Sequence, residues 1–310
     1  MKKVYNDTPD NFAEIQTFVI TDVEEIAKTI IQADKCFFYD ACAFRNHMRI
    51  MNPECIFEYI KRMGGIVVIT RCIIMELCSK DNLLWKEHIE YLKKMYQYGI
   101  KILVMYEEDT FQILNTCYSG TAQINLMLSF AVRTVKSKTG TIETVLNNNS
   151  ALKREILVSG ENKDRLLAKR FFREVRNGKV SEDDLGETLA AVCMHMLSNI
   201  REIMEFKYIL LTDDKGAIAL LDKVIKNVKE HIGRRCISVI TTPKICQLMV
   251  QEHIIKDKEE IESIINAGNI GGLIKIYCSE QYELSPSEKT VSAAEFAQKI
   301  TNNTGIKIYL

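Results

Sequence analysis

Five short apolar runs recur along the chain, and the segments between them carry apolar residues at every third or fourth position. Short runs rich in β-branched and aromatic residues predict buried strands, whereas the longer spacing predicts helices. We expect the strands at 36–40, 66–70, 100–106, 207–212 and 236–240. Because they alternate with helical segments, we predict an α/β fold: a three-layer α/β/α sandwich with a mostly parallel central sheet.

The pattern divides the chain into parts. Residues 107–180 have helical periodicity without a convincing strand, which predicts a helical insertion. After about residue 254 we expect a helix, a strand at 273–278, a helix opened by the capping-box sequence from Ser285 to Glu288, and a last strand at 305–310. We thus predict an N-terminal helical lead, a first half of the domain, the insertion, a second half and a C-terminal extension, at 1–35, 36–106, 107–180, 181–255 and 256–310.

Helix starts are also readable. Thr21 with Glu24 has the spacing of a capping box, and Ser181 precedes an acidic first turn. Thr242 followed by Pro243 is typical of an N-cap and first helical position.

Composition limits the classes of partner. The 310 residues contain 41 Lys and Arg and 41 Asp and Glu, so the formal net charge is zero, and 47% are hydrophobic. A chain this apolar can form a sizeable core. A neutral molecule exerts no overall attraction on nucleic acid, so such a partner would need a local basic surface.

Ten cysteines and five histidines show no zinc-binding pattern, because no Cys-x-x-Cys occurs and no histidines are four residues apart. Most cysteines lie in apolar runs and are expected to be small buried hydrophobes. No cleavable apolar signal follows Met1, and the longest uncharged stretch, 110–132, is too polar to span a bilayer. We expect a protein of the reducing cytoplasm without a membrane segment.

One local basic segment exists. Between Arg133 and Lys179, twelve Lys or Arg face only five acids. Such a run is often a solvated helix face, but this excess also keeps phosphate binding open. The candidates for nucleic-acid contact are Lys169, Arg170, Arg173 and Arg176. Phe171 and Phe172 lie among them, and we expect core packing for one of the two rather than base stacking.

Carboxylates follow three of the five strands. Asp40 ends the first strand, Glu76 lies in the helix after the second, and Asp213 and Asp214 follow the fourth. In an open α/β sheet, ligands bind outside the carboxyl ends of the strands. Singly, each acid could serve only as a helix cap or dipole partner; their repetition favours a site.

A further pair of acids opens the helix before the fourth strand. Asp184 and Glu187 are three residues apart, so they share a helix face and could hold one cation. Carboxylate oxygens are the ligands that Mg²⁺ and Mn²⁺ prefer, and two such ions about 4 Å apart can promote hydrolysis of a phosphodiester.

These residues carry a resemblance. Phe38-Tyr39-Asp40, the stretch from Val68 to Leu77 with its Glu-Leu, Asp184-Leu185-Gly186-Glu187, and Leu211-Thr212-Asp213-Asp214 resemble successive motifs of the PIN-domain nucleases, in a subgroup with a Gly-Glu helix motif. Ser238-Val239-Ile240 and the helix from Pro243 to Ile255 are similar to the family's closing strand and helix. The resemblance covers about 36–106 and 181–255.

The resemblance implies a PIN-like fold and a nuclease dependent on Mg²⁺ or Mn²⁺, most readily an endoribonuclease that hydrolyses single-stranded RNA. It implies Asp40 and Asp214 as principal metal ligands, completed by Glu76 and by Asp184 or Glu187, with Asp213 as the alternative fourth acid. Lys215 and the basic insertion would then contact phosphate.

Two other readings remain. A catalytically inactive PIN-like protein could bind RNA or a protein partner as a scaffold, and a protein inhibitor or an oligomer is compatible with the sequence. A generic Rossmann-like nucleotide binder is disfavoured, because Ala41-Cys42-Ala43-Phe44 stands where a glycine-rich loop would follow the first strand.

Overall fold

A computed structural model describes residues 3–157, 162–180, 183–201, 205–268, 272–279, 283, 285–302 and 306–309. Its centre is a five-stranded, wholly parallel sheet with the strand order β3-β2-β1-β4-β5. The strands are β1 (Lys35–Tyr39), β2 (Gly65–Thr70), β3 (Ile102–Met105), β4 (Tyr208–Leu211) and β5 (Ile237–Ile240). All five lie where the apolar runs predict them.

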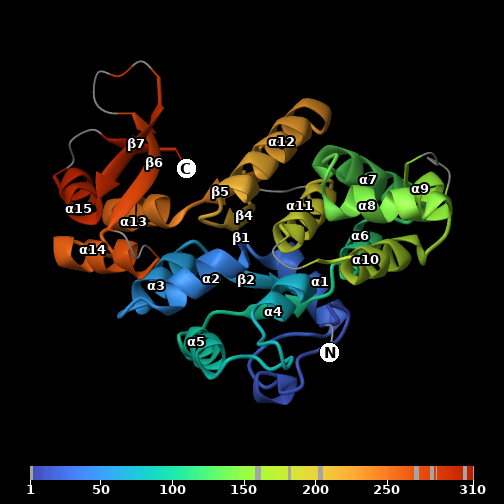
Figure 1. Cartoon of the computed structure of the whole chain (residues 1–310), viewed down its shortest axis with the longest axis horizontal. Helices are drawn as coiled ribbons and strands as arrows, with labels where there is room; N and C mark the ends of the chain where they lie inside the picture. The colour runs from blue at the N-terminus through green and yellow to red at the C-terminus, as the bar shows by residue number, and fades with distance from the viewer. Residues whose placement is uncertain are drawn as a thin grey trace.

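Helices cover both faces of the sheet, which makes the predicted three-layer sandwich (Figure 1). Side chains alternate along each strand, so Phe37 packs into one core and Phe38 into the other. The first core includes residues of α2 (Ala41–Met48), α3 (Glu54–Arg62), α5 (Lys86–Gln97) and α13 (Thr242–Gln251). The second includes residues of α1 (Val23–Gln32), α6 (Asp109–Cys117), α7 (Thr121–Val135), α11 (Leu185–Leu197) and α12 (Lys215–His231). The short helix α4 (Arg71–Glu76) follows β2 directly.

The described part of 107–180 is helical, as predicted. Beyond α6 and α7 it forms α8 (Thr141–Asn148), α9 (Ser150–Leu157) and α10 (Leu167–Asn177). Its helices α6 and α7 pack against α1 and α11, and Phe171 and Phe172 are both fully buried in the second core. The insertion therefore extends the helical layer of the sandwich (Figure 1).

The C-terminal extension contains a second, antiparallel sheet with the order β7-β6-β8. Its elements are α14 (Lys258–Ala267), β6 (Leu273–Ser279), β7 (Ser287–Ser292), α15 (Ala293–Thr301) and β8 (Lys307–Ile308). The predicted helix start at Ser285–Glu288 is wrong, because this segment enters β7 and pairs with β6. The same Ser-x-x-Glu spacing recurs at Ser292, whose side chain accepts a hydrogen bond from the Glu295 amide and caps α15.

Two caps differ by one residue from the prediction. Asp22, not Thr21, caps α1 by accepting from the amide of Glu25. Thr241, not Thr242, caps α13, which leaves the Thr242 hydroxyl free to bond elsewhere. Ser181 lies outside the described residues. A short 3₁₀ helix, η1 (Phe12–Glu14), precedes α1.

Eight of the ten cysteines are buried and all ten are free, which agrees with their predicted role as small core residues. Among the helices of the described ranges, none has the length and apolar character needed to cross a bilayer.

Candidate functional site

The strand order changes direction between β1 and β4, whose connections run to opposite faces of the sheet. At such a switch point the flanking loops diverge and leave a crevice. Asp40 follows β1, and its amide donates to the carbonyl of Leu211 at the end of β4, at 3.0 Å. The chain thus places Asp40 at the crevice that the topology creates.

Asp40 is fully buried. Its Oδ2 accepts a hydrogen bond from the Thr212 hydroxyl at 2.8 Å, and that hydroxyl oxygen accepts from the Asp214 amide at 3.0 Å. Its Oδ1 has no hydrogen-bond partner among the described residues. Thr212 therefore fixes the orientation of the carboxylate and leaves one buried oxygen unsatisfied.

Glu187, in the first turn of α11, lies against Asp40 within hydrogen-bonding reach. Burial, followed by the negative charges of Asp40 and Glu76, raises the pKa of Glu187 to about 9. Its Oε2 also has no partner within the described part of the chain. Two facing carboxyls can share a hydrogen bond only when one holds a proton, so the ionised pair requires a cation between or beside its oxygens.

Glu76 approaches the same pair from α4. A Cβ added to Gly186 would lie 2.8 and 2.9 Å from the two Glu76 carboxylate oxygens, closer than real Cβ contacts. Glycine before Glu187 is thus what lets α11 pack onto this carboxylate. The Gly-Glu sequence has a structural reason, since Gly186 admits Glu76 and Glu187 faces Asp40.

Glu76 already has a cationic partner. The ammonium group of Lys179 lies 2.7 Å from its Oε1 and also forms an ion pair with Asp183. The Lys179 side chain is 4% exposed and its ammonium lies 5.2 Å from the centre of the Tyr5 ring. Arg45 donates to the backbone carbonyl of Glu76 at 2.7 Å. Burial raises the pKa of the Glu76 carboxyl, and the charges of Lys179 and Arg45 oppose this shift.

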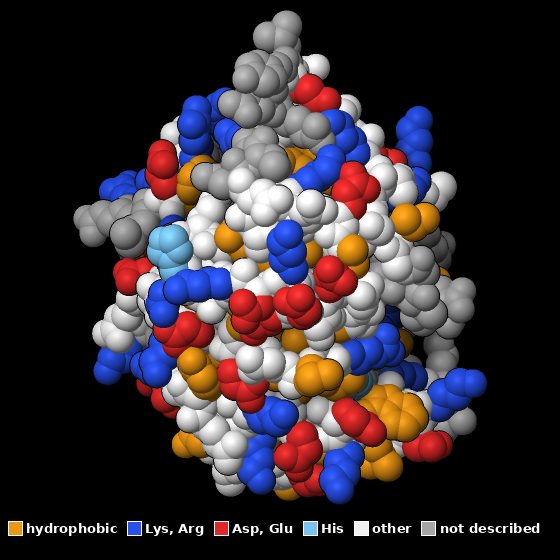
Figure 2. Space-filling model, turned by 90° about the vertical axis from the view of Figure 1, so that its left-hand side faces the viewer, with side chains coloured by type: hydrophobic (Ala, Val, Ile, Leu, Met, Phe, Trp, Pro, Cys, Tyr) orange, Lys and Arg blue, Asp and Glu red, His pale blue; other side chains and the backbone are white. Residues whose placement is uncertain are grey.

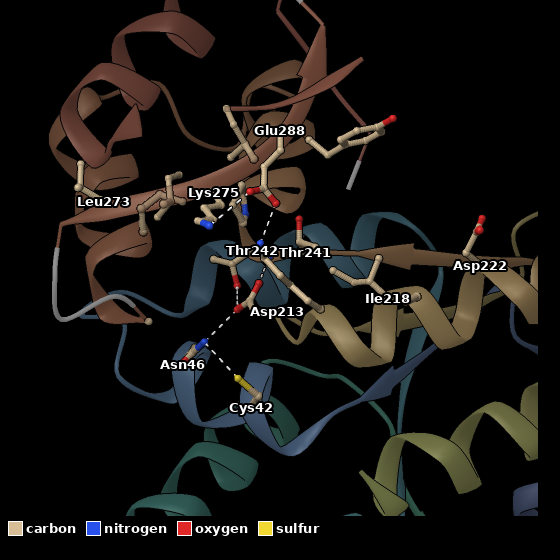
Figure 3. Close-up of a pocket in the computed structure, with 18 of the residues that line it drawn as sticks. Cys42, Asn46, Asp213, Ile218, Asp222, Thr241, Thr242, Leu273, Lys275 and Glu288 are labelled. Carbon is tan, nitrogen blue, oxygen red and sulfur yellow. Dashed lines mark hydrogen bonds and ion pairs between the residues drawn. The ribbon is translucent and has the colours of Figure 1, made fainter. Parts of the chain in front are cut away.

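The two acids after β4 have different partners. Asp213 accepts from the Thr242 amide at 2.7 Å, the Thr242 hydroxyl at 2.6 Å and the Asn46 amide at 2.9 Å (Figure 3). Asp214 is exposed and caps α12 by accepting from the amide of Ala217 at 2.9 Å. Asp213 joins three elements, and Asp214 stays near enough to Asp40 to contribute to its raised pKa, for which burial is the main cause.

A buried hydrogen-bonded chain continues behind Asp213. The Nε2 of His47 lies 3.0 Å from the Thr242 hydroxyl, and its Nδ1 lies 3.0 Å from the Tyr39 hydroxyl. Burial lowers the pKa of His47 to about 4, so the ring is neutral. Asp213 is thus built into the framework. A cleft of about 930 Å³ opens beside it between α12, the start of α13 and β6 (Figure 3).

Asp184 does not join the carboxylates. It is exposed at the N-cap of α11 and lines a separate small cavity with Lys136 and Lys223. Of the two acids that the sequence leaves open, Glu187 is the one that faces Asp40.

The basic candidates separate into buried and exposed groups. Arg176 is 1% exposed and forms ion pairs with Glu107 and Glu108, so it is not available to phosphate, contrary to its inclusion in the basic surface. Arg170 is exposed but pairs with Glu155 and Asp164. Exposed positions for phosphate contact are Lys169 and Arg173 on α10, and Lys215, which pairs with Glu288 at 2.7 Å.

Sequence reasoning included Thr212 in a motif without giving it a role, and it missed the specific role of Lys179. The signal for Thr212 is a hydroxyl residue at the end of a predicted strand, directly before Asp213 and Asp214. Lys179 lies four residues before Asp183, the spacing of a local ion pair, but was indistinguishable among twelve basic residues.

No protein-family model and no curated protein matches this chain. Within the described ranges, no three His, Cys, Asp or Glu side chains are arranged so that they could hold a metal ion together. A pair of carboxylates nevertheless suffices for Mg²⁺, which keeps most of its waters. Asp40 Oδ1 and Glu187 Oε2 are both buried and without a hydrogen-bond partner among the described residues.

Proposed function

We propose that the protein is a divalent-metal-dependent PIN-like nuclease that hydrolyses single-stranded RNA internally. The observation that supports this most is the approach of Asp40 and Glu187 at the crevice of a parallel sheet, where each has one buried carboxylate oxygen without a hydrogen-bond partner among the described residues. An uncompensated pair of this kind costs stability unless it holds a proton or a cation.

The side chains have separate roles in this proposal. Asp40 and Glu187 hold Mg²⁺ or Mn²⁺, while Thr212 keeps Asp40 in the orientation that offers Oδ1. When bound, such an ion activates water and stabilises the charge that develops on phosphate oxygens. Asp214, Asp213 and Glu76 surround the pair, and Asp184 is left out of the site.

The choice of RNA rests on the motif resemblance and on the position of positive charge. On the face that Figure 2 shows, Lys and Arg are interspersed with Asp and Glu rather than gathered. Exposed Lys169 and Arg173 instead lie on α10, shortly before the segment that carries Lys179 to the carboxylates. We therefore expect phosphate contacts along α10.

Cleavage of a mixed-sequence single-stranded RNA tests the proposal, with Mn²⁺, with EDTA, and with Asp40→Asn. Asp184→Asn is a matched control, because it removes an exposed acid from the same helix as Glu187. We expect cleavage that requires Mn²⁺, persists in Asp184→Asn and falls at least about 100-fold in Asp40→Asn. Equal activity in Asp40→Asn and the unaltered protein would overturn the assignment.

A PIN-like RNA-binding scaffold without catalysis is the second candidate. One observation favours it: the Lys179 ammonium satisfies Glu76 and Asp183 without any metal. Under this reading RNA binding in EDTA equals binding in Mn²⁺, and no cleavage occurs in either.

A further inference from the structure

We propose that Lys179 occupies the place of a second cation, so that the site binds one divalent ion, at Asp40 and Glu187, and excludes another from Glu76. This inference rests on the proposed metal-dependent function and concerns how many ions that function uses. It makes Lys179 a positioning residue that acts through Glu76.

The contacts of Lys179 are those of a bridging cation. Its ammonium joins the carboxylate of Glu76, at 2.7 Å, to the carboxylate of Asp183. The ammonium also donates to the backbone carbonyl of Asp183, at 3.4 Å. An ammonium has three N–H groups, and three oxygen atoms surround this one. Its hydrogen-bonding capacity is directed at the protein rather than at a substrate.

The surroundings hold the ammonium in place. The Lys179 side chain is 4% exposed, and the side chains of Glu76 and Asp183 are 14% and 11% exposed. The ring of Tyr5 lies 5.2 Å from the ammonium, and Gly186 closes directly onto Glu76. Asp183 is further fixed by the Thr141 hydroxyl, which donates to it at 2.8 Å. A mobile surface lysine would offer no such fixed charge.

A second divalent ion at Glu76 would meet this charge. Lys179 neutralises Glu76, and Lys3 and Arg45 add positive potential around the same carboxylate. An ion placed there would be repelled by the buried ammonium. This repulsion is stronger than in water because the surroundings of the ammonium have a low dielectric constant. The pair of Asp40 and Glu187 has no corresponding internal cation among the described residues.

The same geometry predicts what removal of Lys179 does. Lys179→Met retains the length of the stem but leaves Glu76 and Asp183 facing a vacated position between two carboxylates. That arrangement is suited to Mn²⁺. We therefore expect the variant to gain a metal site that the unaltered protein lacks, and the gain to require Glu76.

Mn²⁺ stoichiometry in the full-length protein, measured by isothermal titration calorimetry and by electron paramagnetic resonance of free Mn²⁺, tests this. We expect one ion for the unaltered protein, two for Lys179→Met, and one for the double variant Lys179→Met/Glu76→Gln. The double variant also removes one of the two carboxylates that Lys179→Met leaves without an ammonium. Two ions bound to it would show that the second site does not need Glu76, even if Lys179→Met is poorly folded by circular dichroism.

The outcomes separate the two proposals. Two ions on the unaltered protein would contradict the role of Lys179 and leave the nuclease proposal standing. No bound ion would contradict both. One ion in the unaltered protein but also one in a folded Lys179→Met would show that the lysine does not exclude a second ion, which overturns the inference. If Lys179→Met does not fold, two ions on the double variant would overturn it equally.

Discussion

Two pairs of carboxylates lie side by side in this molecule and differ in one respect. Glu76 and Asp183 are bridged by the buried ammonium of Lys179, whereas Asp40 and Glu187 face each other with unpartnered oxygens. The first pair has a buried cationic partner as soon as the chain folds. The second is complete only with a proton or an added cation, and that difference separates a structural ion pair from a candidate metal site.

The contrast also explains why proximity to the crevice is a poor criterion for function. Asp213 lies at the same sheet edge as Asp40, yet its oxygens receive three hydrogen bonds from Thr242 and Asn46. Its carboxylate is used to join β4 to α2 and α13. The hydrogen-bond partners of the carboxylate oxygens distinguish the structural role of Asp213 from the proposed metal-binding role of Asp40.

The largest expected effect comes from breaking the bridged pair. Lys179→Met should lower the free energy of unfolding by about 3 to 5 kcal/mol in metal-free buffer, because it leaves buried carboxylates without their cation. Asp40→Asn should do the opposite above about pH 9, where Glu187 is ionised, and stabilise the metal-free protein by relieving repulsion with Glu187. Urea unfolding in EDTA measures both; destabilisation by both variants would show that the pairs do not differ as described.

Loss of Asp213 should be next in size. Asp213→Ala leaves the Thr242 amide and hydroxyl without their acceptor, which we expect to cost about 1 to 3 kcal/mol. Mn²⁺ affinity should change little, since this carboxylate is committed to the framework. Parallel urea and calorimetric titrations check this, and a lost Mn²⁺ site with unchanged stability would instead make Asp213 a ligand.

A smaller effect concerns pH. The pKa of Glu187 is raised to about 9 in the folded protein, so folding favours its protonated form. In EDTA, the contribution is present below about pH 4.5 and is lost as pH rises toward about 9. We expect stability to decline across this window, because ionisation of Glu187 is unfavourable at a buried position beside Asp40. Glu187→Gln should flatten the decline, and an identical pH profile for the variant would contradict the shift.

The smallest effects on stability should come from the exposed basic residues. Lys169→Ala and Arg173→Ala should each change stability by less than about 0.5 kcal/mol. If they contact phosphate, each should lower the slope of RNA affinity against salt by about one. Arg176 is the buried contrast on the same helix. Because it forms a buried ion pair with Glu107, its replacement should destabilise the fold rather than weaken RNA binding alone. Fluorescence anisotropy over a salt series measures the slope.

Much of the fold was predictable because its strands are buried on both faces. A continuous apolar run such as Ile66–Thr70 predicts a central parallel strand, because such a strand is buried on both faces and needs no alternation of polar residues. Short-range signals were less reliable where the same motif occurred twice: Ser285–Glu288 and Ser292–Glu295 both have capping-box spacing, and pairing of β7 with β6 decided between them.

The candidate site was predictable only in outline. Strand ends located Asp40, Glu76 and Asp213, but sequence could not say which oxygens remain free after folding. The choice of Glu187 over Asp184 depends on the rotation of α11, which Gly186 permits by packing against Glu76. The neutralisation of Glu76 depends on Lys179, about one hundred positions away, and no local pattern reveals that contact.

The most direct test is a crystal structure of the protein with Mn²⁺, in which anomalous scattering locates the metal. We expect one peak, bound by Asp40 Oδ1 and Glu187 Oε2, with Lys179 still between Glu76 and Asp183. A peak at Glu76 or at Asp213 instead, or none at Mn²⁺ concentrations that support RNA cleavage, would contradict it.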